Sequence, residues 1–482
     1  MKTAAHWKKI GQRPHHGILA PLFSIRTQNS SGIGEFLDLL PLIDWCVSIG
    51  LDVIQLLPIN DSGEDLSPYY AVSSCALDPV YLSLFALPGA QNLSDFKSLS
   101  STHRVERLEV RKKKLEWLYA YFQTHFQPKD PTYIAFLKHH QSWLPAYTEF
   151  KTKKDPTLPA EFHSYLQFLC FSQMKTAREH ASNQGVFLKG DIPILFNPDS
   201  ADVLAEKHLF DLTLSAGAPP DQYNALGQNW GFPLFRWDAL RFERYAWWKR
   251  RLQVASELFH LYRIDHVVGY FRIWAIPQGK NPMEGHFVPP DPNLWMNQGR
   301  EILQMMIDAS PLLPIAEDLG TIPKGVTDVL KELGICSTKV FLWQKRGSPP
   351  KTIPLSQYEP LSLTTVSTPD SDPLAVMWEK YPDLSHPYTE FKRWPSGQPL
   401  TSAQRKELLR DAHHTSSLFH INLLQETLAL FPELVNPNPE EERINVPGTL
   451  LPTNWTYRFR PSIEEMRAHV GLKAAFREIL SH

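Results

Sequence analysis

The sequence predicts an α/β protein folded as a (β/α)8 TIM barrel, with large helical insertions over the carboxyl-terminal face of the barrel. Eight short apolar segments are spread along the 482 residues, and most are followed by a helical pattern. This alternation is typical of parallel strands that are covered on both faces. Acidic residues end several of the segments, which is where barrel enzymes carry their chemistry. The long gaps between segments have helical patterns of their own, so they predict insertions rather than loops.

The apolar segments predict the barrel strands in chain order. The first four are Gly17–Ser24, Asp52–Ile59, Val186–Ile194 and Leu258–His266. The last four are Leu312–Leu319, Thr338–Trp343, Ser362–Pro369 and Ile444–Thr449. Eight such units with helices between them indicate a closed barrel.

Strand spacing predicts how the chain is divided. Helical patterns such as Val105–Phe126 and Ala160–Ser182 fill the longest gap, which therefore predicts a helical subdomain. The predicted parts are the first barrel strands (1–59), this helical insertion (60–184), the barrel continuation with the catalytic strands (185–396), a second helical insertion (397–440), and the last strand with a C-terminal helix (441–482).

Composition excludes several classes of partner. The net charge is −2 and the isoelectric point is about 6.8, so neither nucleic acid nor an anionic membrane is an expected partner. No apolar run reaches the length of about 18 residues that a membrane span needs, and Met1–His16 lacks the apolar core of a signal peptide. The oligomeric state is not predicted. Widely spaced cysteines argue against a zinc or disulfide framework and favour the cytoplasm; they are Cys46, Cys75, Cys170 and Cys336.

Three strand ends carry candidate catalytic carboxylates. Arg263 and Asp265 are two residues apart on one strand and therefore share a face. A neighbouring guanidinium favours the charged form of a carboxylate, as a nucleophile requires. Glu317 ends a strongly apolar strand, where burial raises a carboxyl pKa and suits a general acid. Asp265 and Glu317 match the pair of carboxyls, tuned in opposite directions, of a retaining glycosidase. Asp370, at the third strand end, is expected to bind sugar hydroxyls near the scissile bond.

Each carboxylate also has a simpler interpretation. A single Asp at a strand end is more often a helix N-cap than a catalyst, and Asp318 and Asp372 fit that role. Aromatic side chains such as Tyr69 and Trp230 also serve as core or loop anchors. From the residues alone, both interpretations stay open.

An ordered series of motifs over nearly the whole chain resembles the 4-α-glucanotransferases of glycoside hydrolase family 77, also called amylomaltases or disproportionating enzymes. The motifs are Ser67-Pro68-Tyr69, Gly190-Asp191-Ile192-Pro193-Ile194, Pro219-Pro220-Asp221-Gln222-Tyr223, Gly227–Leu234, Arg263-Ile264-Asp265-His266, Ala316-Glu317-Asp318-Leu319-Gly320, Lys339-Val340-Phe341 and Asn445–Thr449 with Asn454-Trp455.

The resemblance implies transfer of α-1,4-glucan segments between maltodextrins through a covalent glucosyl-enzyme, with no cofactor and no metal. It implies that Asp265 is the nucleophile, Glu317 the acid/base and Asp370 the transition-state stabiliser. The remaining implied residues contact the maltooligosaccharide or orient the site: Tyr69, Asp191, Trp230, Arg263, Trp343 and Asn445.

The sequence departs from the family pattern at Pro369, because the family usually has His before the third carboxylate. Proline has no side-chain donor. The loss of one neutral hydrogen bond to a sugar, about 0.5–1.5 kcal/mol, predicts up to a tenfold loss of turnover. Pro369 also restricts the residue before it, so Asp372 is the alternative third carboxylate. The loop 278–292 departs from the family as well.

Three other functions compete with glucan transfer. An α-amylase-type retaining hydrolase would use the same acid/base pair. In a non-catalytic glucan-binding protein, Pro369 would mark the loss of a former catalytic site. A metal-dependent hydrolase is the weakest alternative, since His413-His414 is unaccompanied by ligands at metal-binding spacing.

Overall fold

The structure is a computed structural model that describes residues 1–91, 93–220 and 226–481. Asp221, Gln222 and Tyr223 of the predicted Pro219–Tyr223 motif lie outside the described residues.

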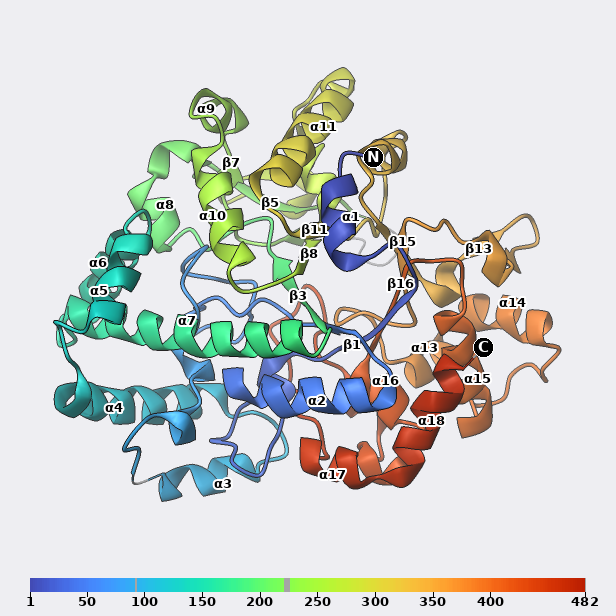
Figure 1. The fold of residues 1–482 in the computed structure, drawn as a ribbon. Helices are drawn as coiled ribbons and strands as arrows, with labels where there is room; N and C mark the ends of the chain where they lie inside the picture. The colour runs from blue at the N-terminus through green and yellow to red at the C-terminus, as the bar shows by residue number, and fades with distance from the viewer. Residues whose placement is uncertain (92, 221–225, 482) are drawn as a thin grey trace.

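Eight parallel strands form a closed barrel at the centre of the molecule (Figure 1). Neighbouring strands follow chain order, and a parallel bridge between Ile315 and Cys336 joins the two ends of the sheet. The Ala316 N–H donates to the Cys336 carbonyl at 2.8 Å across the same junction. The predicted (β/α)8 fold is therefore confirmed. The strands are β1 (His15–Leu19), β2 (Val53–Gln55), β3 (Phe187–Ile192), β8 (Leu261–Ile264), β11 (Leu313–Ala316), β12 (Ser337–Val340), β15 (Ser362–Thr365) and β16 (Phe419–Leu423).

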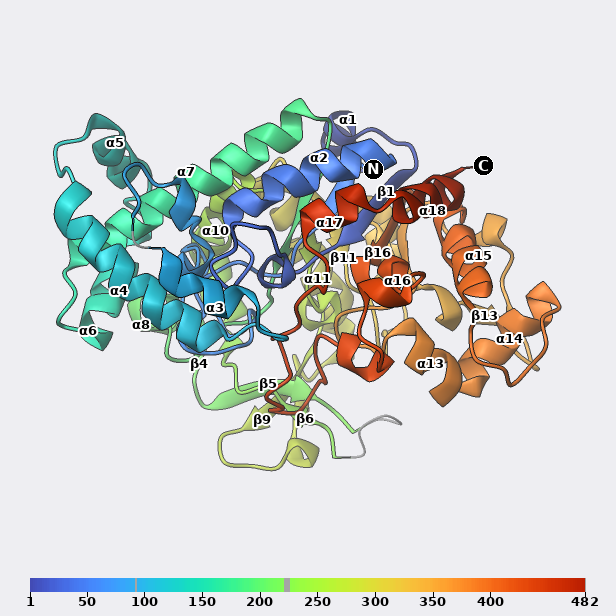
Figure 2. The same cartoon turned by 90° about the horizontal axis from the view of Figure 1, so that it is seen from below.

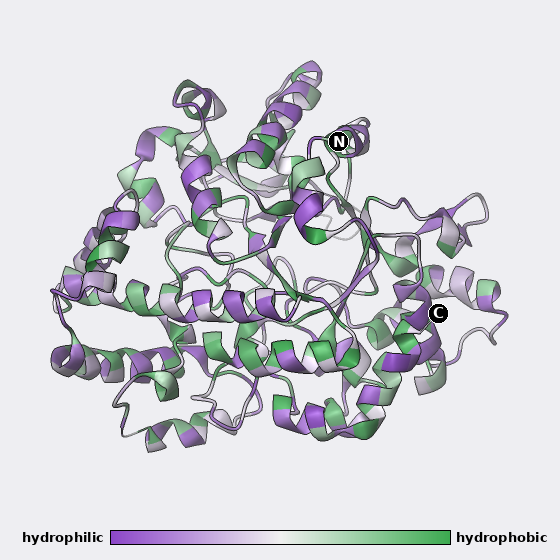
Figure 3. Ribbon diagram, in the orientation of Figure 1, coloured by the Kyte–Doolittle hydropathy of each residue, from purple (hydrophilic) through white to green (hydrophobic). Residues whose placement is uncertain are grey.

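Helices surround the barrel, and their hydrophobic residues pack on the strands. Helix α2, for example, is coloured as hydrophobic over much of its length (Figure 3), and six of its side chains are buried. The helices that directly cover the barrel are α2 (Leu39–Ile49), α7 (Ala160–Asn183), α10 (Ala246–Ser256), α11 (Pro292–Ala309), α12 (Val326–Leu333), α15 (Ser402–His413), α17 (Ile463–Ala468) and α18 (Val470–Leu480). Helix α1 (Ala4–Ile10) hydrogen-bonds to the residues just before β11 and β12.

The last strand is not where the sequence predicted it. Ile444–Thr449 is a loop, and the eighth strand is Phe419–Leu423, inside the segment 397–440 that was predicted to be a helical insertion. Pro447 cannot donate to a ladder, and the Val446 N–H donates instead to the Asn454 side chain. The true strand was hidden because the polar residues His420 and Asn422 interrupt its apolar run, and because it continues without a loop into helix α16 (Leu424–Leu428).

The segment between β2 and β3 is mostly helical. It contains α3 (Lys97–Ser100), α4 (Arg107–His125), α5 (Pro131–His139), α6 (Leu144–Lys154) and α7. Seen from below, α4, α5 and α6 lie beside α7 on the far side from the C-terminal helices (Figure 2).

A buried ionic network fixes the loop that leaves β2. Arg111 on α4 pairs with Asp61 at 3.0 Å and Asp78 at 2.5 Å, and Arg107 pairs with Asp78 at 2.6 Å. Removing one partner from such a buried network leaves an uncompensated charge. The network therefore clamps the loop 60–78, which carries Tyr69.

Smaller elements complete the fold. A four-stranded antiparallel sheet joins β5 (Leu214–Ala218), β6 (Gln228–Asn229), β9 (Ile273–Pro277) and β10 (His286–Val288), so part of the loop 278–292 is a hairpin strand. Helices α8 (Ala201–Ala205) and α9 (Trp237–Phe242) follow β3, while α13 (Leu374–Lys380) and α14 (Pro382–Lys392) follow β15. Within the described residues, no helix combines the length and apolar character needed to cross a bilayer.

Candidate active site

A cavity of about 1040 Å³ opens at the carboxyl-terminal ends of the barrel strands. Six of the predicted site residues line it: Tyr69, Asp191, Arg263, Glu317, Trp343 and Asp370. Asp265, Trp230 and Asn445 contact these lining residues or their neighbours. The structure thus brings together predicted residues that are separated by up to several hundred positions in the sequence.

Arg263 is the centre of the site. Its Nη1 atom lies 2.8 Å from Asp191 Oδ1 and 2.9 Å from Asp265 Oδ1, and its Nη2 atom lies 3.7 Å from Glu317 Oε2. The three carboxylates come from neighbouring strands, because β3, β8 and β11 are adjacent. Asp265 and Glu317 contact the same guanidinium, so the two carboxylates lie on either side of one cation.

The surroundings of Glu317 allow its carboxyl group to hold a proton near neutral pH. Burial raises its pKa to about 7, with a further increase from the nearby Asp265 carboxylate, and Arg263 opposes both effects. The His266 backbone N–H donates to Glu317 Oε2 at 2.9 Å, which fixes the carboxyl group in place. A buried carboxyl with this pKa suits a general acid/base.

His266 has a backbone conformation that sequence reasoning did not anticipate. Its φ is +41°, in the left-handed region that non-glycine residues rarely adopt. This turn directs its N–H at Glu317, and its imidazole packs edge-on against Trp230 with the ring centres 5.1 Å apart. Trp230 therefore lies next to the site, because it packs on His266, which lines the cavity. Strained residues of this kind cluster at functional sites.

Asp370 points into the cavity even though Pro369 precedes it. Asn445 Nδ2 donates to Asp370 Oδ1 at 2.6 Å, and the Asn445 backbone N–H donates to the Pro369 carbonyl at 3.2 Å. Burial raises the pKa of Asp370. Asp372 also lines the cavity. Its carboxylate, however, already forms ion pairs with Arg443 and Lys380 and accepts a hydrogen bond from the Tyr381 hydroxyl.

Tyr69 and Asp191 support the same side of the site. The Tyr69 hydroxyl donates to Asp191 Oδ2 at 2.8 Å, and its ring packs against Trp455. Trp343 lies on the opposite wall, and 39 % of its surface is exposed, as an apolar platform for a sugar would require.

Other cavity residues were missed in the sequence. Lys189 lies two positions before Asp191 on the same face of β3, and its Nζ atom donates to Gln55 at 2.8 Å on the cavity floor. The period of two along a strand was the available signal. Tyr381 and Arg443 come from connecting segments, and no sequence pattern placed them at the site.

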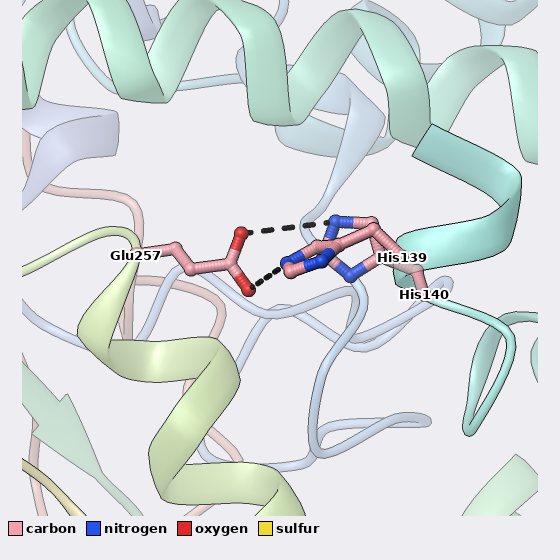
Figure 4. A group of neighbouring side chains, drawn as sticks. All are labelled: His139, His140 and Glu257. Carbon is pink, nitrogen blue, oxygen red and sulfur yellow. Dashed lines mark hydrogen bonds and ion pairs between the residues drawn. The ribbon is translucent and has the colours of Figure 1, made fainter. Parts of the chain in front are cut away.

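One group of described residues brings three potential metal ligands together, away from this cavity. His139 and His140, at the end of α5, face Glu257 after α10 (Figure 4), with His139 Nε2 3.0 Å and His140 Nε2 3.8 Å from its carboxylate. Trp143 Nε1–H donates to His140 Nδ1, so the neutral imidazole carries its proton on Nε2. A metal on Nε2 would need the opposite tautomer, with Nδ1 donating. The geometry suits a hydrogen-bonded contact between α5 and α10.

Comparison with known proteins decides the family. The sequence profile of the 4-alpha-glucanotransferase family matches residues 20–158 and 151–464. The chain belongs to this family. The chain is 42 % identical to the 4-alpha-glucanotransferase of Chlamydia pneumoniae over 99 % of its own length and 98 % of the relative. It is 27 % identical to the Synechocystis enzyme over 89 % of its length and 91 % of the relative.

Two solved structures share the fold. An amylomaltase from Streptococcus agalactiae in complex with acarbose superposes with a TM-score of 0.82 at 22 % identity, covering 97 % of this chain and 99 % of that one. The amylomaltase from Corynebacterium glutamicum gives 0.85 at 22 % identity, covering 99 % and 76 %.

Membership of the family assigns the activity. The chain is a glycosyltransferase that carries out transglycosylation on α-1,4-glucans, as the resemblance implied. The hydrolase and binding-protein alternatives are not favoured.

Proposed function

We propose that Asp265 is the nucleophile and Glu317 the acid/base of a retaining double displacement on maltooligosaccharides, with Asp370 stabilising the transition state. The observation that carries this assignment is the single Arg263 guanidinium that joins Asp265 and Glu317. Arg263 Nη1 lies 2.9 Å from Asp265 Oδ1, and Glu317, whose pKa burial raises to about 7, is able to carry a proton.

In the first step, Asp265 attacks the anomeric carbon while Glu317 protonates the departing 4-oxygen. This breaks the α-1,4 bond and forms a β-linked glucosyl-enzyme. In the second step, Glu317 removes the proton from the 4-hydroxyl of an acceptor sugar, whose oxygen displaces Asp265. A new α-1,4 bond forms and both carboxyl groups return to their starting states.

The remaining residues bind and orient the glucan. Asp191 and Tyr69 hold Arg263 and the glycosyl unit on one side, and Trp230, Trp343 and Asn445 contact sugars around the cleavage point. The Streptococcus agalactiae amylomaltase, which shares this fold, binds acarbose, and this supports an oligosaccharide as the ligand of this chain. The predicted parts 1–59, 60–184 and 185–396 are kept in this proposal, with the helical insertion 60–184 supporting the Tyr69 loop. The predicted parts 397–440 and 441–482 are joined into one, because β16 lies within 397–440.

The compartment is proposed from the cysteines. Cys46, Cys75, Cys170 and Cys336 are all free thiols, which fits the reducing environment of the cytoplasm.

The test is the product pattern from pure maltotriose. We expect glucose and a ladder of longer maltodextrins, whereas a hydrolase would give shorter sugars only. Asp265→Asn should abolish the ladder while the variant unfolds at the same temperature as the wild type. Asp328→Asn, on the exposed face of α12, is the matched control and should keep the full ladder. Turnover of Asp265→Asn close to the wild-type value would refute the assignment.

A further inference from the structure

Arg251 is a fully enclosed cation that the reaction described above does not use. It lies on α10, is 1 % exposed, and has no carboxylate bonded to it within the described residues. Three aromatic rings surround its guanidinium: Phe196 at 4.4 Å, Trp248 at 5.0 Å and Trp247 at 5.7 Å from the ring centres. Burial lowers the pKa of Arg251 to about 10, so it keeps its charge at neutral pH. Buried charges without an ionic partner are costly and therefore call for an explanation.

Among the described residues, this guanidinium makes one hydrogen bond, and it leads towards Asp265. Arg251 Nη1 donates to the Pro193 carbonyl at 2.7 Å, while Nε and Nη2 have no partner among the described residues. The same peptide group presents its other end, the Ile194 N–H, to Asp265 Oδ2 at 3.1 Å. The Pro193–Ile194 peptide is thus held between a cation at its oxygen and a carboxylate at its N–H.

We infer that Arg251 is a positioning residue for Asp265 and acts on it through the Pro193–Ile194 peptide. This inference rests on the proposed role of Asp265 as nucleophile. Resonance couples the carbonyl oxygen and the N–H of one peptide unit. A cation at the oxygen increases the positive charge on the N–H, and chains of hydrogen bonds polarise one another in this way. The N–H then holds the ionised carboxylate more firmly.

The arrangement gives each oxygen of Asp265 its own fixed donor. Arg263 Nη1 holds Oδ1 from within the cavity at 2.9 Å, and the Ile194 N–H holds Oδ2 from the side of α10. Arg251 and Asp265 also act electrostatically on each other, and other titratable groups act on one or both of them. Around Asp265 they are Tyr69, Asp191, Arg263, His266, Tyr270, Glu317 and Asp370, and around Arg251 they are Cys75, Asp202, Tyr262 and Tyr270. Asp202 is engaged with Ser74 and Trp247, which leaves the Pro193 carbonyl as the acceptor for Arg251.

The test compares Arg251→Met with a matched buried arginine. Arg458 is 5 % exposed and donates to the carbonyls of Gly32, Leu99 and Ser100, none of which lines the cavity. Both Arg251→Met and Arg458→Met should lower the melting temperature. Only Arg251→Met should lower kcat, by roughly tenfold at pH 7 with KM little changed. In this variant the acidic limb of the kcat/KM profile should also move to higher pH, by about half a unit to one unit. Arg251→Lys keeps the charge in the cage and should restore most of both effects.

A direct measurement covers the case in which Arg251→Met does not fold. The Ile194 amide can be assigned in a 15N-isoleucine spectrum from the signal that Ile194→Val removes. Its proton resonance should move upfield in Arg251→Lys, because its hydrogen bond to Asp265 is weaker, and it should move further in Arg251→Met if that variant folds.

The relay would be overturned if the Arg251 variants keep both the wild-type acidic limb and the wild-type Ile194 resonance, even if their melting temperatures fall. Loss of activity in Asp265→Asn would leave the proposed function standing in that case. Retained activity in Asp265→Asn would instead contradict the proposed function itself, so the two failures are distinguishable.

Discussion

At the residue scale, the site depends on the contrast between two carboxyls that share one guanidinium. Arg263 lies 2.9 Å from Asp265 but 3.7 Å from Glu317, so it stabilises charge on the first more than on the second. Both residue types and their strand positions were visible in the sequence. Their closeness was not, because it depends on β8 and β11 being neighbours in the sheet.

The pH dependence of glycosylation should report Glu317. Its pKa of about 7 means that it is protonated below that pH and loses its proton above it, so kcat/KM should fall on the alkaline side of neutrality. Glu317→Gln should reduce turnover of maltotriose by about 10²–10⁴-fold. α-Maltosyl fluoride, whose leaving group needs no proton, should still glycosylate the variant, and mass spectrometry should detect the accumulated maltosyl-enzyme. Equal losses with both donors would contradict the acid/base role.

Pro369 gives a second prediction at this scale. Asn445 donates to both the Asp370 carboxylate and the Pro369 carbonyl, so Asp370 lies at the cavity although Pro369 precedes it. What remains absent is a side-chain donor at position 369. Pro369→His should therefore raise kcat by up to about tenfold, the value of one recovered neutral hydrogen bond. Pro369→Ala supplies no donor and is the control; an equal gain in both variants would point to the backbone instead.

At the scale of elements, the chain shows where sequence periodicity is informative. Seven predicted strands correspond to β1, β2, β3, β8, β11, β12 and β15, because each is a short apolar run bounded by turns. The eighth failed because His420 and Asn422 interrupt the apolar run of Phe419–Leu423, and because this strand continues into helix α16 without a loop. The relay from Arg251 was equally hidden, since a contact with a carbonyl 58 residues away leaves no pattern in the sequence.

The outer face of β16 carries a buried histidine that should make stability depend on pH. His420 stacks on His16 between β1, β16 and α15, and burial lowers its pKa to about 3. The pKa of His420 is therefore lower in the folded protein than its value of 6.5 in the unfolded chain. Such a base makes its full contribution to the free energy of unfolding above pH 6.5, and this contribution is lost as the pH falls towards 3. His420→Gln should destabilise the fold at pH 7. The difference in free energy of unfolding between the wild type and His420→Gln should shrink by up to about 1.4 kcal/mol per pH unit below 6.5.

Urea unfolding of the wild type and His420→Gln at pH 7, 6 and 5 measures this difference. His286→Gln, at an exposed position on β10, is the control and should show a constant difference. A constant difference for His420→Gln would show that the buried imidazole does not resist protonation.

At the scale of the whole molecule, stability and catalysis are placed at opposite ends of the barrel. Trp7 on α1 is 3 % exposed and packs on Phe419, the first residue of β16, at the amino-terminal end. Asp370 stands at the carboxyl-terminal end beside the other acidic groups. Substitutions at these two positions should therefore have opposite consequences.

Trp7→Ala should lower the free energy of unfolding by about 3–5 kcal/mol, as expected for a large side chain removed from a core. Its kcat should match the wild type at temperatures where it stays folded, because α1 does not reach the cavity. Asp370→Asn should lose most of its turnover yet unfold at the same or a higher denaturant concentration, since it removes a buried charge that lies near Asp265. Urea titrations and initial rates on the same samples check both expectations. A folded Trp7→Ala with a reduced kcat would show that the two ends of the barrel are coupled.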